Sequence, residues 1–173
     1  SLISHSMKKY GIFYGSTTGA TQEVARKLAD ILGVADADVH NVADTAPDAV
    51  ADYSVLLLGS STWGSGDLQD DWYDFLKGLE VLDLHDKKIA IFGVGDESMS
   101  DTFCNAVGII YKALQPTGAT FIGAFPDNVY TFEHTEADQD GVAVGLLLDQ
   151  TNRPDLTEDR LKAWADEVAA QSK

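Results

Sequence analysis

The sequence contains little cysteine and no long apolar run, and each shortage excludes a class of protein. Cys104 is the single cysteine of 173 residues, so no disulfide can form within the chain. No apolar run approaches the length of a membrane span, and no export signal is apparent. We therefore expect a protein that stays in the reducing cytoplasm and does not act in a membrane.

Basic residues are also scarce. The chain has 12 lysines and arginines against 28 aspartates and glutamates, which gives a net charge of −16. A field of this sign repels nucleic acid and anionic membrane surfaces. It favours encounter with a basic partner, although the same charge also serves solubility alone.

The overall amino-acid composition is that of an ordinary globular protein, with 45 % hydrophobic and 23 % charged residues. The length suits one domain with a substantial core. Residues 1–6 precede Met7, show no pattern, and are expected to be an artificial leader. We therefore assign a single domain to residues 7–173.

Apolar runs of strand type alternate with amphipathic segments of helix type. This alternation predicts an α/β fold, with a doubly wound parallel sheet and helices on both faces. In the fifth strand, the apolar pattern that begins near 119–124 stops for a polar segment, 125–143, and resumes at 144–149. Strands are expected at 10–14, 38–41, 53–60, 88–93 and 119–124, and helices at 19–32, 69–79, 102–114 and from a cap at Thr157 onwards.

The first expected strand ends in a loop rich in hydroxyls, which reads G-S-T-T-G-A-T from Gly15 to Thr21. Unpaired N–H groups at the start of the following helix favour an anion, and the hydroxyls add donors. No lysine follows, and the glycine spacing fits neither a nucleotide P-loop nor a dinucleotide fingerprint. The loop therefore predicts a phosphate monoester site, while an ordinary turn with a capping hydroxyl is the alternative.

Two further loops end neighbouring strands of the predicted sheet. The loop 59–66 carries Trp63 among residues too small to bury an indole, so a flat ligand would cover it by stacking. The alternative is an indole that folds back onto its own domain. The loop 93–101 offers backbone donors, carboxylates and Met99, a flexible side chain that can pack against a ring. The alternative is that this acidic loop is simply a solvated surface. Since ligands bind beyond the carboxyl ends of such strands, the loops together predict a mononucleotide site.

These loops resemble those of the flavodoxins, and the resemblance extends from Met7 to about Gln171. S-T-T-G-A-T at 16–21 is similar to their phosphate signature, and S-S-T-W-G at 60–64 to their tryptophan loop. G-V-G-D-E at 93–97 and F-C-N-A at 103–106 resemble their third flavin loop and the helix after it. The polar segment 125–143 resembles the extra loop of the long-chain subgroup. The resemblance implies non-covalently bound FMN and a five-stranded sheet of order 2-1-3-4-5.

The same resemblance implies which residues bind the cofactor. They are Ser16, Thr17, Thr18, Gly19, Ala20, Thr21, Ser60, Ser61, Thr62, Trp63, Gly64, Gly66, Gly93, Gly95, Asp96, Met99, Asp101, Phe103, Cys104 and Asp149. The chain departs from the family at two places. Ser60-Ser61-Thr62 stands where Thr-Pro-Thr is common, and Met99 is nearest to the position of a stacking tyrosine.

By resemblance the protein is a one-electron carrier that shuttles between semiquinone and hydroquinone, without catalytic residues or a metal. Acidic side chains near the flavin, Asp96, Glu97, Asp101 and Asp149, are expected to lower the potential of the second step. The Gly64 carbonyl resembles the one that accepts a hydrogen bond from flavin N5. The expected partners of this monomer are basic-faced enzymes, namely reductases of the flavodoxin reductase type and low-potential acceptors.

Alternatives from other classes remain at this point. An FMN-dependent NAD(P)H quinone reductase would use the same fold but needs a nicotinamide pocket. A receiver domain needs acidic residues where this chain has Tyr14-Gly15 and Ser60-Ser61. A flavinless binding module would follow if Met99 failed to support stacking. The segment 125–143 serves either as a partner-docking loop or as a solvent loop held by its aromatic residues.

Overall fold

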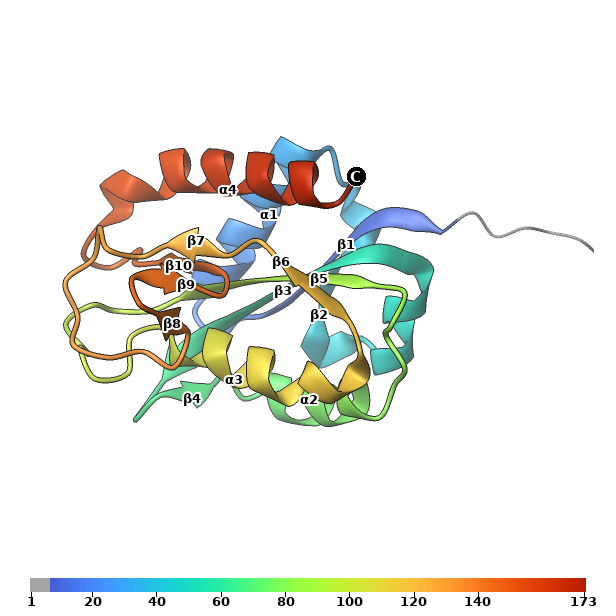
Figure 1. Ribbon diagram of the computed structural model, residues 1–173, viewed down its shortest axis with the longest axis horizontal. Helices are drawn as coiled ribbons and strands as arrows, with labels where there is room; N and C mark the ends of the chain where they lie inside the picture. The colour runs from blue at the N-terminus through green and yellow to red at the C-terminus, as the bar shows by residue number, and fades with distance from the viewer. Residues whose placement is uncertain (1–6) are drawn as a thin grey trace, which may run out of the picture.

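The computed structural model describes residues 7–173, so the leader expected at residues 1–6 lies outside the described residues. A central parallel sheet has the order β10-β5-β3-β1-β2, with β6 also paired to β5, and helices cover both of its faces (Figure 1). A short strand, β4, pairs antiparallel with the end of β3. The strands are β1 (Lys8–Gly15), β2 (Val39–Asn41), β3 (Tyr53–Trp63), β4 (Asp67–Leu68), β5 (Lys88–Val94), β6 (Thr120–Ile122) and β10 (Leu146–Leu148).

The fifth strand of the expected sheet is present as two halves. β6 pairs in parallel with residues 88–90 of β5, and β10 pairs in parallel with residues 92–94 of the same strand. The chain therefore leaves the sheet after β6 and returns in line with it. This register confirms both the strand order 2-1-3-4-5 and the interruption of the fifth strand.

The helices form two layers. Helices α1 and α4 cover one face of the sheet, and α2 and α3 cover the other (Figure 1). Val24, Leu28 and Trp164 lie in the core beneath the first pair, whereas Trp72 and Ile110 lie beneath the second. The helices are α1 (Ala20–Leu32), α2 (Trp72–Glu80), α3 (Asn105–Ala113) and α4 (Thr157–Gln171), and the 3-10 turns are η1 (Asp36–Asp38), η2 (Val42–Asp44), η3 (Pro47–Asp52), η4 (Gln115–Thr117) and η5 (Pro154–Leu156). Across residues 7–173, no helix combines the length and apolar character that crossing a membrane requires.

Several predicted boundaries were wrong. Helix α3 begins at Asn105 rather than near 102, because Cys104 has a left-handed backbone (φ 51°) that a right-handed helix cannot include. Helix α2 begins at Trp72 rather than at 69, and strand β3 continues to Trp63. Thr157 is the first helical residue rather than a cap, and its hydroxyl is hydrogen-bonded to Gln150.

The segment 125–143 forms a small antiparallel sheet that the sequence did not predict, made of β7 (Phe125–Pro126), β8 (Asp138–Gln139) and β9 (Val142–Ala143). Its aromatic side chains hold it against the domain, since the Phe103 ring lies 5.1 Å from Tyr130 and 5.0 Å from Phe132. A side-chain carbon on Gly108 of α3 would lie 2.5 Å from the Glu136 backbone. The segment is therefore packed closely on α3.

A buried polar group lies where this segment meets the sheet. The Asp127 side chain is buried beside Asp138. Burial above all, and then the charge of Asp138, raises the pKa of Asp127 to about 6. Arg160 of α4 lies nearby, with its guanidinium 4.9 Å from the Tyr130 ring and one nitrogen donating to the Pro126 carbonyl at 2.9 Å.

We expect Asp127→Asn to stabilise the protein at pH 7. Because the folded-state pKa of Asp127 lies above its unfolded-state value, its favourable contribution exists at low pH and is lost as pH rises through about 6. Thermal unfolding should show a Tm increase of about 3 °C or more at pH 7 and a smaller one at pH 4.5. Asp140→Asn, at an exposed position of the same segment, is the control. An equal Tm change at both pH values would contradict the assignment.

Candidate functional site

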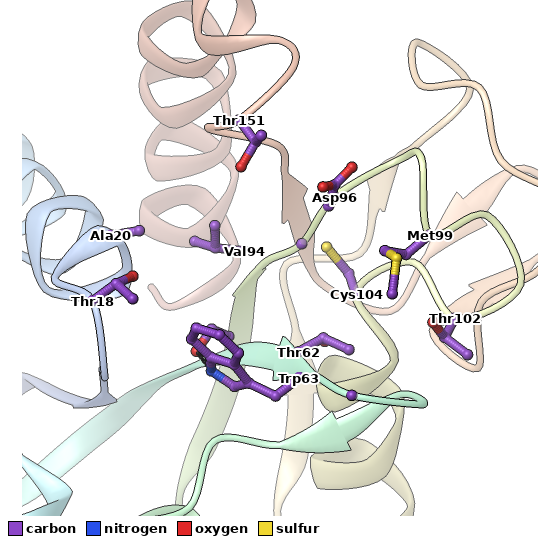
Figure 2. A pocket seen from close by; sticks show the side chains of 13 residues that line it. Thr18, Ala20, Thr62, Trp63, Val94, Asp96, Met99, Thr102, Cys104 and Thr151 are labelled. Carbon is purple, nitrogen blue, oxygen red and sulfur yellow. Dashed lines mark hydrogen bonds between the residues drawn. The ribbon is translucent and has the colours of Figure 1, made fainter.

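One pocket opens at the carboxyl ends of β1, β3 and β5, where the three predicted loops meet (Figure 2). Its volume is about 310 Å³, within the range of small-molecule sites. A fourth loop, after β10, also contributes to its wall. The lining residues are Thr18, Ala20, Ser61, Thr62, Trp63, Gly64, Val94, Gly95, Asp96, Met99, Thr102, Cys104 and Thr151.

The first loop ends at the start of α1, where the first helical N–H groups have no partner within the helix. Gly19 is the N-cap of α1, with a left-handed backbone (φ 97°), and as a glycine it has no side chain that could cap the helix. Ser16 Oγ accepts a hydrogen bond from the Gly19 N–H at 3.1 Å, and Gln69 Nε2 donates to Thr17 Oγ1 at 3.1 Å. The first N–H groups of α1 therefore remain available to an anion.

Thr21 is the most informative residue of this loop. Its side chain is fully buried, and its Oγ1 has no hydrogen-bond partner among residues 7–173. A buried hydroxyl without a partner costs free energy unless a ligand satisfies it. Its position in the first turn of a helix makes an anionic oxygen a suitable partner, which fits a phosphate group.

The second loop places an indole at the pocket. Trp63 remains 40 % exposed, so it does not fold back into the core, and its Nε1 donates to Ser61 Oγ at 2.7 Å. Figure 2 shows the indole bordering the same space as Val94 and Met99. Gly64, the next residue, has φ 54°, a conformation that glycine adopts without strain. The ring is therefore held in place while its face stays open to a flat ligand.

The third loop supplies an ionised carboxylate and a flexible apolar group. Asp96 Oδ1 accepts hydrogen bonds from Ser98 Oγ at 2.6 Å and from Asn152 Nδ2 at 2.6 Å. The Ser98 hydroxyl, chiefly, lowers the pKa of Asp96, so this carboxylate is charged at neutral pH. Met99 is 52 % exposed and can pack against a ring.

The structure brings ten of the twenty predicted site residues into the pocket lining. Ser16, Thr17, Gly19 and Thr21 belong to the same first loop but lie beside the lining. Phe103 packs in the core, and Asp149 is buried beneath the third loop. The other predicted residues that lie off the lining are Ser60, Gly66, Gly93 and Asp101.

Three lining residues were missed by sequence reasoning: Val94, Thr102 and Thr151. Thr151 follows the end of β10, so the rule that ligands bind beyond the carboxyl ends of strands could have indicated it. Cys104 does line the pocket, but its thiol is fully buried. Burial raises its pKa, so it is not a reactive thiolate.

The chain matches the flavodoxin family model over residues 12–164. It is also 41 % identical over 164 residues to Flavodoxin 1 of Salmonella typhimurium, covering 93 % of each chain. The chain belongs to the flavodoxin family. Flavodoxin 1 of Azotobacter vinelandii is 43 % identical over 163 residues, which cover 91 % of this chain and 94 % of that protein.

A solved structure shares this fold. The Fusobacterium nucleatum flavodoxin, crystallised bound to flavin mononucleotide, superposes with a TM-score of 0.87 at 27 % identity. The match covers 96 % of this chain and 100 % of that one. Within residues 7–173, no group of three or more histidine, cysteine or acidic side chains lies close enough to hold a metal ion.

Proposed function

We propose that the pocket binds FMN non-covalently and that the protein is a low-potential one-electron carrier. The observation that supports this most is the Thr21 hydroxyl, which is buried without a hydrogen-bond partner among residues 7–173, in the same loop as Thr18 and Ala20, which line the pocket together with the Trp63 indole. A phosphate monoester joined to a flat ring satisfies both groups. Bound FMN supplies a ring system that accepts and releases electrons, and the protein tunes it.

The residues divide between the two ends of the ligand. Ser16, Thr18, Thr21 and the first N–H groups of α1 would hold the phosphate with neutral donors. Trp63 would stack against the ring, and Met99 would supply an apolar contact to it. Because Met99 offers less area than an aromatic ring, the stacking there is weaker than a tyrosine would give.

The charges around the ring favour a low potential. Asp96 is ionised at the pocket wall, and the next residue, Glu97, donates its N–H to the buried Asp149 carboxylate. Negative charges oppose the addition of electrons to a nearby group by Coulomb repulsion. Asp101 adds to the same field from the end of the third loop.

The partners of a flavodoxin are redox proteins. For this chain we propose basic-faced ones, reductases as donors and low-potential enzymes as acceptors, because its net charge of −16 attracts them. Residues 7–173 would act as one domain, as a monomer, in the cytoplasm. Electron-transfer rates that fall steeply with added salt would support this docking.

The decisive experiment is a visible spectrum of the purified protein, followed through a spectroelectrochemical titration. We expect a flavin spectrum and two separate one-electron midpoint potentials, the second lower than the first. A single two-electron step would instead indicate a reductase, and rapid NADPH oxidation by the protein alone would point the same way. A colourless protein that does not take up added FMN would refute the proposal.

A further inference from the structure

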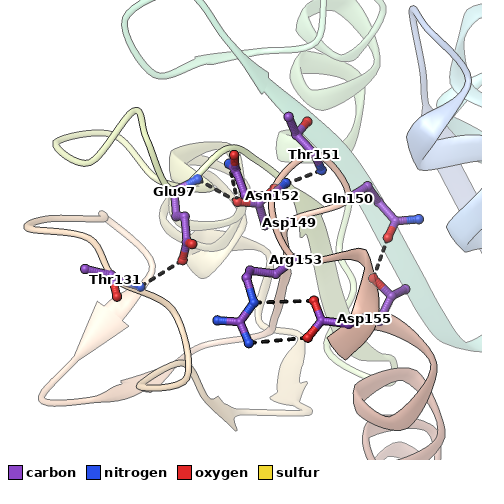
Figure 3. Close-up of polar contacts among 9 residues, drawn as sticks. Glu97, Thr131, Asp149, Gln150, Thr151, Asn152, Arg153 and Asp155 are labelled. Carbon is purple, nitrogen blue, oxygen red and sulfur yellow. Dashed lines mark hydrogen bonds and ion pairs between the residues drawn. The ribbon is translucent and has the colours of Figure 1, made fainter.

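Asp149 is the most completely buried carboxylate of the site, with 0 % exposure. It ends β10 and lies directly behind the third loop (Figure 3). By the charge argument above it is one more negative group near the ring. Its contacts indicate a different role.

Both carboxylate oxygens of Asp149 are saturated with donors. Oδ1 accepts the N–H groups of Thr151 at 2.9 Å and Asn152 at 2.8 Å. Oδ2 accepts the N–H group of Glu97 at 2.8 Å and the Asn152 side-chain amide at 2.8 Å. Four donors around one buried group fix its position.

These donors come from two loops that both line the pocket. Glu97 lies between Asp96 and Met99 in the third loop, while Thr151 belongs to the loop after β10. The Asn152 amide continues the connection, because the same Nδ2 donates to Asp96 Oδ1 at 2.6 Å. Asp149 therefore joins the two loops that build one wall of the pocket.

We propose that Asp149 is a positioning residue for the flavin site, which holds the third loop at the distance that the ring requires. The inference rests on the proposed function, since FMN is taken as the ligand. Asp149 acts through the Glu97 backbone and through Asn152 rather than by touching the ligand.

Asparagine at this position has the right size, but it replaces one acceptor oxygen by an NH₂ group that donates. An amide has one acceptor oxygen, whereas both Asp149 oxygens receive N–H groups. The least costly arrangement places the new NH₂ at the Oδ2 position, where the Asn152 amide can turn to accept it. The Glu97 N–H then loses its acceptor, and the hydrogen bond from Asn152 Nδ2 to Asp96 Oδ1 is broken.

The two possible roles of Asp149, as a nearby negative charge or as a residue that positions the loop, predict opposite changes in FMN affinity for Asp149→Asn. If Asp149 mattered only as a charge, its removal would relieve repulsion of anionic FMN and tighten binding. If it positions the loop, FMN binding weakens. We expect the Kd for FMN to rise about tenfold, together with a change in the midpoint potentials.

The test measures the Kd for FMN by titration of the apoprotein and amide hydrogen exchange at Glu97 by NMR. In apo Asp149→Asn, exchange at Glu97 should accelerate at least tenfold while the amides of β3 stay protected, which also shows that the variant folds.

Asn152→Ala keeps the charge and breaks only the side-chain link, so its Kd should rise two- to fivefold. Asp159→Asn, exposed on α4, controls for net charge.

Unchanged or tighter FMN binding by Asp149→Asn, with Glu97 still protected, would overturn the inference. An Asn152→Ala variant that binds FMN as the parent does, with unchanged Glu97 exchange, would also count against it. If the parent protein itself bound no FMN, the proposed function would fail. The exchange measurement on the apoprotein would still report on the loop contact.

Discussion

Thr21→Val is expected to weaken FMN binding by about 10- to 100-fold while leaving riboflavin binding unchanged. Valine keeps the shape of threonine but removes the hydroxyl. A hydrogen bond to a charged group contributes about 1.5–3 kcal/mol. Riboflavin lacks the phosphate, so it does not use this donor. Titration of the apoprotein with both ligands measures the difference.

The same substitution should act on the apoprotein in the opposite direction. Because Thr21 Oγ1 is buried without a partner among residues 7–173, its removal relieves an uncompensated polar group and raises the Tm of the apoprotein. Thr117→Val is the matched control, since that buried hydroxyl donates to the Leu114 carbonyl at 2.6 Å. It should lower the Tm and leave FMN binding as it was. Equal losses of FMN and riboflavin affinity in Thr21→Val would disprove a phosphate contact.

Trp63→Ala is the second change with a large expected effect. Stacking of a flat ring on an aromatic side chain contributes about 1–3 kcal/mol, so the Kd should rise about 5- to 100-fold. The loss applies to FMN and riboflavin alike, because the ring is common to both. Trp63→Phe keeps a ring but loses the hydrogen bond to Ser61, so a two- to fivefold rise is expected.

Tyr73 provides the control for this pair. It is 44 % exposed on α2 and does not line the pocket. Tyr73→Ala removes a similar aromatic surface and should leave both affinities unchanged. If Trp63→Ala reduced FMN binding but not riboflavin binding, the indole would act through the phosphate loop and the stacking assignment would be wrong. Together the Thr21 and Trp63 variants separate the two ends of the ligand.

The local sequence pattern determined the architecture. Val55–Leu58 is a continuous apolar run, as a strand buried on both faces must be, and the structure places it at the centre of the sheet. Val24 and Leu28 recur at helical spacing and lie in one core cluster. Because strands and helices alternate along the chain, the strands form a parallel sheet, and the loops that bind ligands lie together at its carboxyl edge. The hydroxyl loop and Trp63 could therefore be assigned to one pocket.

Contacts between distant residues were decided only by the tertiary structure. The bond from Glu97 N–H to Asp149 spans 52 residues, as does the bond from Gln69 to Thr17, and neither leaves a periodic signal. The late start of α3 depends on the left-handed backbone of Cys104, which a propensity argument does not expect of cysteine. Periodicity reports which face of an element is buried. Which loop residues meet depends on strand register and loop closure, and these are fixed only when the sheet assembles.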